Sequence, residues 1–223
     1  MTDKDITIVL CIPGNWQLQA DLPVIQDVVI EWRPHDHQLA HAFKHAGLQR
    51  FSTEELRAIE KHASIALLSG KGGSLAAAAK MMQAGLTLLK AGGLGIKVET
   101  SGKAFNTQAW EELVHMDHDH RFYEAFVLLV KGADNSIHSC GMHNLGFRDT
   151  LSDAIGELMD TAELVDIFCI YQILEDPAIT DGQTFSTAPD SAVYTIREEP
   201  CTFYTPGDYF YNPYGILHLT QAD

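Results

Sequence analysis

The fold is decided by residues 74–91, SLAAAAKMMQAGLTLLKA, and by the apolar runs on either side of them. Apolar residues recur here at helical spacing, which predicts an amphipathic helix with one buried stripe. The stripe consists of Leu75, Ala78, Ala79, Met82, Leu86 and Leu89. Residues 62–69 and 94–99 have the pattern of buried strands. A strand, a helix and a strand in this order predict a right-handed crossover between two parallel strands of one sheet.

Similar patterns predict the rest of the chain. Strands are expected at residues 6–12, 27–32, 123–131 and 137–141, the last two forming a hairpin, and helices at 36–46, 107–115 and 151–175. Ser52 and Glu55 have capping-box spacing and predict a further helix start. The tail from residue 183 alternates apolar residues with Pro and Gly turns, which is typical of short strands.

These elements predict an α+β fold in which helices flank a mixed β-sheet, including the strand–helix–strand crossover at about 62–99. No linker or low-complexity segment divides the chain. We therefore expect a single domain over residues 1–223, with residues 115–122 as the place where a subdivision could fall.

Composition limits the classes of function. The chain has 15 basic and 30 acidic residues, a formal charge of −15. Such a surface repels phosphate backbones and anionic lipids, so we expect no nucleic-acid partner and no membrane partner, whereas a basic protein partner is allowed. The N-terminus lacks the basic and apolar regions of a secretory signal. Four widely spaced cysteines do not form a disulfide framework, and we expect a cytoplasmic protein with free thiols.

Histidines are numerous, and three of them have the spacing of metal ligands. His37, His41 and His45 would line one face of a helix, where two such residues can chelate a metal. A zinc site needs a third ligand and partners that orient the rings, and the sequence indicates neither. The segment 115–120, HMDHDH, fits an exposed loop. We expect no metal site and no cofactor.

The run 70–74, GKGGS, lies between a strand and a helix, as a phosphate-binding loop does. A phosphate loop is longer and places a Lys-Ser or Lys-Thr pair at the helix start, whereas Lys71 precedes the glycines here. A tight turn followed by a Ser74 helix cap is the preferred interpretation.

Five polar residues gather at predicted strand ends, where sheets often bind ligands. They are Ser101, Lys103, Cys140, His143 and Asn144. A catalytic role for Cys140 would require a lowered thiol pKa and an oriented histidine, which sequence proximity does not establish. The five residues are ligand-binding candidates, and no catalytic residue is assigned.

Several motifs resemble a bacterial family, domain of unknown function 4261. They are GLGIKVETSGKAFNTQAW at 93–110, YEAFVLLVKGADNSIHSCGMHNLGFRDT at 123–150, DGQTFS at 181–186 and YNPYG at 211–215. The likeness extends from about residue 63 to the C-terminus. It implies a cytoplasmic bacterial α+β protein, and it supplies no catalytic residues because none is assigned to the family.

Two functional hypotheses follow. The leading one is a non-enzymatic binding protein, such as an immunity-type protein that masks a basic partner, because the chain is acidic and lacks a complete catalytic constellation. The alternative is a small-molecule enzyme or sensor with a pocket near Ser101, Lys103, Cys140 and His143. An enclosed cavity lined by at least three of the five candidates would favour the alternative.

Overall fold

The computed structural model describes residues 5–16 and 24–222 of the chain. Its helices are α1 (Leu39–Ala46), α2 (Thr53–Glu60), α3 (Leu75–Lys90), α4 (Thr107–His115), α5 (His120–Phe126), α6 (Leu158–Glu175) and the short 3₁₀ helix η2 (Met142–Leu145). Its strands are β1 (Thr7–Gly14), β2 (Val28–Pro34), β3 (Ser64–Lys71), β4 (Ile96–Val98), β5 (Lys103–Phe105), β6 (Leu128–Lys131), β7 (Ile137–Cys140), β8 (Asp149–Ser152), β9 (Thr184–Phe185), β10 (Tyr194–Glu199) and β11 (Ile216–Gln221).

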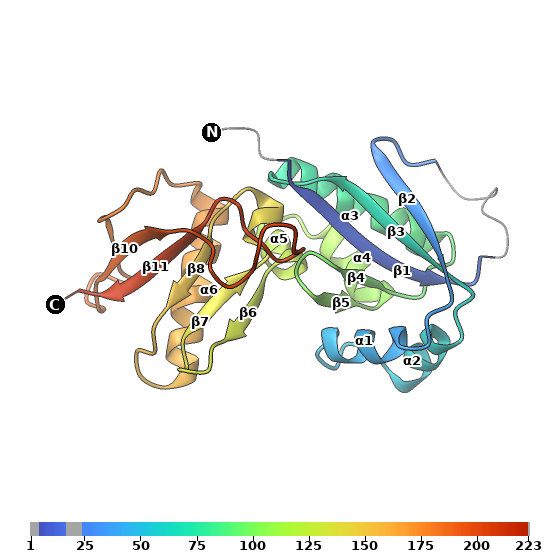
Figure 1. Ribbon diagram of the computed structural model, residues 1–223, viewed down its shortest axis with the longest axis horizontal. Coiled ribbons are helices and arrows are strands. Elements are labelled where there is room, and N and C mark those ends of the chain that lie inside the picture. The colour runs from blue at the N-terminus through green and yellow to red at the C-terminus, as the bar shows by residue number, and fades with distance from the viewer. Residues whose placement is uncertain (1–4, 17–23, 223) are drawn as a thin grey trace.

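The first sheet has the order β2-β3-β1-β4-β5, and every pair in it is antiparallel. Strand β1 lies in the middle and is apolar on both faces, so alternate side chains enter different cores. Leu10 and Ile12 pack in the cluster that contains the α3 side chains, whereas Cys11 packs with Phe43 of α1 and Ile59 of α2. Helices therefore cover both faces of this sheet (Figure 1).

Helix α3 connects β3 to β4, which confirms the crossover. Both strands run antiparallel to β1, which lies between them, so they share a direction but do not pair with one another. Ser74 caps α3 by accepting a hydrogen bond of 3.2 Å from the Ala77 N–H. Four side chains of the expected stripe are buried, namely Ala78, Met82, Leu86 and Leu89. Leu75 and Ala79 are half-buried.

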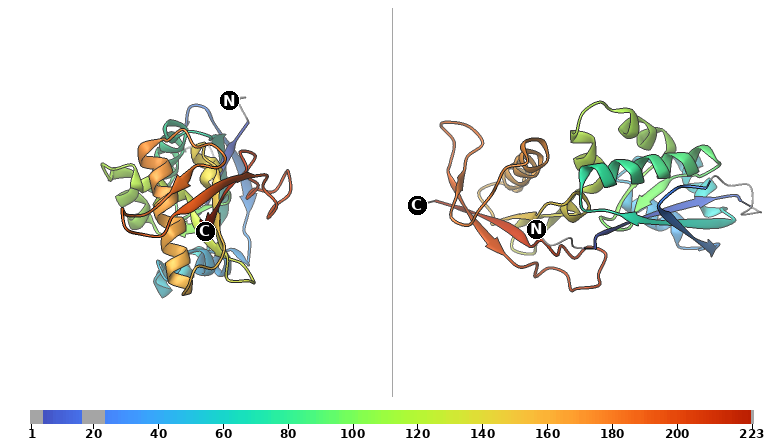
Figure 2. Two further views of the ribbon diagram at one scale, coloured as in Figure 1. Left: turned by 90° about the vertical axis from the view of Figure 1, so that its left-hand side faces the viewer. Right: turned by 90° about the horizontal axis from the view of Figure 1, so that it is seen from above.

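The second sheet is mixed and has the order β6-β7-β8-β11-β10-β9. Strands β8 and β11 are parallel, and the other pairs are antiparallel. Helix α6 covers one face, where Leu164 and Phe168 pack against Ile196 and Leu217. The two sheets lie end to end along the molecule (Figures 1 and 2). The α+β class is thus confirmed, with the strands divided between two sheets instead of gathered in one.

Two element boundaries differ from the prediction. The hairpin β6–β7 begins at Leu128, because residues 120–126 form α5. The helix predicted from residue 151 begins at Leu158, because 149–152 form β8. Gly156 has φ +138°, a conformation that favours glycine, and the Glu157 N–H then donates to the Asp160 carboxylate at 3.0 Å at the start of α6.

The largest core cluster crosses from one sheet to the other. It joins Leu10 of β1 and Met82 of α3 to Ile137 of β7 and Cys169 of α6. The Tyr123 hydroxyl of α5 donates a hydrogen bond to the Asp166 carboxylate of α6. In the described ranges, no helix combines the length and apolar character needed to cross a bilayer.

Candidate functional site

The five candidate residues are all buried where the first sheet meets the second. Relative exposures are 1% for Ser101, 5% for Lys103, 2% for Cys140, 3% for His143 and 0% for Asn144. The Asn144 side-chain amide donates to the carbonyl oxygens of Gly141 at 2.9 Å and Thr100 at 3.4 Å. This contact brings the β4–β5 turn, which carries Ser101, against η2, which carries His143 and Asn144.

Lys103 points in another direction and has a structural partner. Its ammonium donates to the Val127 carbonyl oxygen at 2.8 Å, and the Glu124 carboxylate lies 4.0 Å away. Burial lowers the lysine pKa to about 8, and Glu124 partly opposes that shift. Lys103 therefore ties β5 to the connection between α5 and β6.

Cys140 and His143 do not have the electrostatics of a nucleophilic pair. Burial raises the pKa of the Cys140 thiol, and the Asp149 carboxylate raises it further, so the thiolate is disfavoured. Burial lowers the pKa of His143 to about 4, which keeps this ring neutral at pH 7. Cys11, Cys140, Cys169 and Cys201 are all free thiols, as expected, and only Cys201 is not fully buried.

Several buried polar atoms at this junction have no hydrogen-bond partner among the described residues. They are Thr100 Oγ1, Ser101 Oγ, His143 Nδ1 and Asn144 Oδ1. Buried polar atoms of this kind commonly bind internal water in proteins. None of the five candidates lines any of the three cavities described for this chain, so their role as ligand-binding residues stays a prediction.

Asp149 forms a buried polar network that the sequence did not indicate. Its carboxylate accepts hydrogen bonds from Ser139 Oγ at 3.1 Å, the Met142 N–H at 3.2 Å and the Asn212 side chain at 2.8 Å. Burial raises the carboxyl pKa to about 7, although these donors act in the opposite direction. Asn212 lies 63 positions from Asp149, so no local motif contains the whole network.

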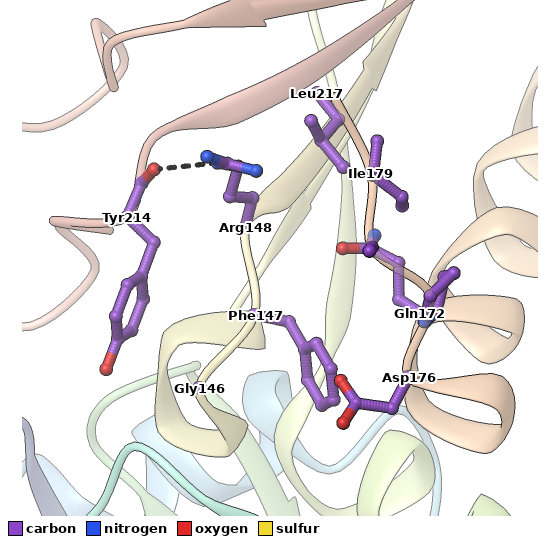
Figure 3. Close-up of a pocket in the computed structure, with 10 residues that line it drawn as sticks. Gly146, Phe147, Arg148, Gln172, Asp176, Ile179, Tyr214 and Leu217 are labelled. Atoms are coloured by element: carbon purple, nitrogen blue, oxygen red, sulfur yellow. Dashed lines mark hydrogen bonds between the residues drawn. The ribbon is translucent and has the colours of Figure 1, made fainter. Parts of the chain in front are cut away.

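A cavity of about 420 Å³ lies at the C-terminal end of α6. It is lined by Gly146, Phe147, Arg148, Gln172, Asp176, Pro177, Ala178, Ile179, Tyr214 and Leu217. Arg148 and Tyr214 stand on one side, and Gln172, Asp176 and Ile179 on the other (Figure 3). Volume and mixed lining are typical of a ligand or side-chain pocket.

The arginine in this cavity has its charge compensated. Arg148 Nε donates to the Tyr214 carbonyl oxygen at 3.2 Å, and Nη2 forms an ion pair with the Glu198 carboxylate at 3.2 Å. Asp176 is different, because its exposed carboxylate has no interaction partner among the described residues. The cavity therefore presents one uncompensated negative charge.

Charge is divided unequally along the chain. Residues 132–223 contain 15 acidic and two basic residues, so they carry −13 of the total −15. Twelve of the acidic residues are exposed; Asp149 is buried, Asp166 is half-buried, and Asp223 lies outside the described residues. Both basic residues are paired, Arg148 with Glu198 and Arg197 with Asp181. Counting charges separately for the two parts of the chain would have revealed this asymmetry.

The histidines do not assemble a metal site in the part of the chain that the structure describes. Helix α1 begins at Leu39, so His37 lies outside it and contacts His35 instead, with 3.0 Å between their ring nitrogens. His41 and His45 are paired as the spacing predicts, with 3.0 Å between their Nε2 atoms, and no third ligand joins them.

The glycine turn before α3 does not offer a phosphate cradle. The Gly72 N–H donates to the Ile6 carbonyl oxygen at 2.8 Å, and the Gly73 N–H donates to the Asn144 carbonyl oxygen at 2.9 Å. Phosphate loops need such backbone donors to be free.

Comparisons with protein-family models, curated proteins and solved structures found no match. The resemblance to domain of unknown function 4261, drawn from the motifs after residue 63, therefore stays a prediction.

Proposed function

We propose that this chain is a non-enzymatic binding protein whose acidic part, residues 132–223, binds a basic protein partner. The observation that carries the proposal is the concentration of −13 formal charges on this part, while residues 1–131 are close to neutral. Because the exposed carboxylates outnumber the two paired arginines, their field extends into solvent. Such a field attracts basic proteins and raises their association rate.

The buried ionisable side chains also favour a binding protein. Enzymes with a cysteine nucleophile lower the thiol pKa and place a base beside it, whereas here burial raises the Cys140 pKa and lowers the His143 pKa. Lys103 donates to a carbonyl and has an ion-pair neighbour, so its amine is held in a structural contact. These features favour binding over catalysis by a cysteine nucleophile, and an immunity-type protein that masks a basic partner is the kind of binding protein we propose.

The test uses poly-L-lysine as the basic probe and two triple variants with equal charge changes. The first variant is Glu163→Gln, Glu175→Gln and Asp190→Asn, which alters three exposed acids in residues 132–223 whose carboxylates form no hydrogen bond or ion pair with the described residues. The control variant is Glu54→Gln, Glu60→Gln and Asp117→Asn in residues 1–131. All six side chains are exposed, so folding should be retained in both variants.

We expect the first variant to bind poly-L-lysine roughly three- to tenfold more weakly than wild type at low salt, since each exposed ion pair contributes well under 1 kcal/mol. The control variant should change the affinity by less than about twofold. Raising the salt from about 50 mM to about 500 mM should remove most of the binding, because screening shortens the reach of these charges. Equal losses in the two variants, or binding indifferent to salt, would contradict the proposal.

A further inference from the structure

The C-terminal end of α6 has an unusual charge distribution. A helix C-terminus carries partial negative charge on its last carbonyl groups, and proteins commonly place Lys, Arg or His there. Helix α6 has no basic residue in its last turn, and Glu175 and Asp176 add two exposed carboxylates instead. The last carbonyl groups and the carboxylates of Glu175 and Asp176 therefore all give this helix end a negative potential. No basic residue in the last turn of α6 offsets it.

This negative helix end opens into the 420 Å³ cavity. Asp176 is both the C-cap residue of α6 and a lining residue of the cavity. Phe147, Ile179 and Leu217 supply apolar surface beside it, and Gln172 supplies an amide. Figure 3 shows Phe147 beside Asp176, opposite the side where Arg148 is held by Tyr214. A cation in this cavity would meet the free Asp176 carboxylate beside the apolar side chains of Phe147 and Ile179.

Two alternatives are less suited to this chemistry. A bare metal ion would need several converging ligands, and the described residues contain no such group. An anion would have only Arg148 to bind, whose charge is already compensated by Glu198 at 3.2 Å. The surrounding charge of −13 on residues 132–223 also opposes an anion.

We infer that this cavity anchors an arginine side chain of the basic protein partner. The inference rests on the proposed function and adds the point of contact. The aliphatic part of the arginine lies along Ile179 and Leu217, and its guanidinium binds the Asp176 carboxylate near the aromatic face of Phe147. A planar guanidinium suits this arrangement because it can pair with a carboxylate and stack on an aromatic ring. Interfaces often depend on a few such buried anchors.

The test is an NMR titration of the isotopically labelled full chain with the peptide Ac-Gly-Gly-Arg-Gly-Gly-NH₂. The control peptide contains citrulline, a neutral isostere, in place of arginine. With the arginine peptide, we expect saturable chemical-shift changes at the backbone amides of Phe147, Asp176 and Ile179. The citrulline peptide should bind at least about tenfold more weakly, because it loses a charge-assisted hydrogen bond.

Two variants and one matched control complete the test. Asp176→Asn should weaken binding of the arginine peptide about tenfold, because the guanidinium loses its charged partner. Ala178→Trp should block binding because the larger side chain fills the cavity. Glu54→Gln removes one exposed carboxylate in residues 1–131, away from the cavity and its helix end, and should change affinity by less than about twofold. The amide spectra of all three variants report whether the fold is intact.

The inference is overturned if the cavity amides do not shift, if the citrulline peptide binds as well, or if Asp176→Asn binds as tightly as wild type. Binding of free arginine without binding of the peptide would assign the cavity to a small metabolite and also contradict it. If the arginine-peptide tests fail while poly-L-lysine still binds through residues 132–223, only the arginine-binding role of the cavity is refuted. Loss of that localised poly-L-lysine binding would instead remove the proposed function.

Discussion

The side-chain amide of Asn212 donates a hydrogen bond of 2.8 Å to the buried carboxylate of Asp149, 63 positions earlier in the chain. Asp149 begins β8, and Asn212 lies in the connection between β10 and β11. The same amide also donates to the Phe147 carbonyl oxygen at 3.1 Å. The pair therefore fixes this long connection at the start of the parallel β8–β11 ladder.

Asp149→Asn should change how stability depends on pH. The carboxyl pKa is about 7 in the folded protein against a usual value of 3.8, because burial disfavours the charged form. The folded chain thus holds a proton that the unfolded chain releases between these values. The contribution of the protonated Asp149 carboxyl to the free energy of unfolding is complete below about pH 4 and is lost as the pH rises to about 7.

Urea unfolding of wild type and Asp149→Asn, at a series of pH values from about 4 to about 8, measures this contribution. The free energy of unfolding of wild type, relative to the variant, should decrease across this window. A difference between the two proteins that is independent of pH would show that Asp149 titrates normally.

His143→Gln should show the opposite dependence. Burial lowers the His143 pKa from 6.5 to about 4, so the unfolded chain binds a proton there before the folded chain does. The contribution of the neutral ring is present above about pH 6.5 and is lost as the pH falls to about 4. The same unfolding series should therefore show wild type losing stability relative to His143→Gln on acidification, and a parallel pair of curves would refute the assignment.

Leu86→Ala should destabilise the protein by about 2–5 kcal/mol, as large-to-small changes in a core do. Leu86 is 1% exposed and belongs to the cluster that joins α3 to the first sheet. Lys80→Ala on the exposed side of the same helix should change stability by less than about 0.5 kcal/mol. Chemical unfolding of both variants decides the point, and a loss below about 0.5 kcal/mol for Leu86→Ala would contradict the buried stripe.

Gly85→Ala tests how closely α3 approaches its neighbours. Alanine raises helix propensity by about 1 kcal/mol over glycine, but a Cβ at this position would lie 2.5 Å from Ile96 Cδ1 and 3.2 Å from Trp110 Nε1. Overpacking of this kind costs about 1–3 kcal/mol. We therefore expect a net destabilisation in thermal or chemical unfolding, whereas a more stable variant would show that Ile96 moves aside without cost.

The sequence predicted the features that depend on local periodicity. The α3 stripe and the Ser52–Glu55 capping box follow from residues within a few turns of one another, and both are present in the structure. The insertion of β1 between β3 and β4 depends on long-range pairing, which periodicity does not encode. Leu151 fits the spacing of α6, yet it pairs with His138 and His218 in the second sheet.

The candidate site was predictable only in part. Ser101 and Asn144 were expected near one another, and the structure brings their segments together through the Asn144–Thr100 hydrogen bond. Lys103 was expected beside them, but its ammonium turns to Val127. The cavity at Asp176 combines residues from 146 to 217 and has no sequence motif, because its walls come from three separate segments, 146–148, 172–179 and 214–217.

The central claim is that residues 132–223 are the binding surface for a basic partner. The most direct measurement is hydrogen–deuterium exchange of the full chain with and without poly-L-lysine at low salt. We expect slowed exchange to concentrate in residues 132–223, including the end of α6, and to disappear at high salt. Protection confined to residues 24–131, or spread evenly over both parts, would contradict it.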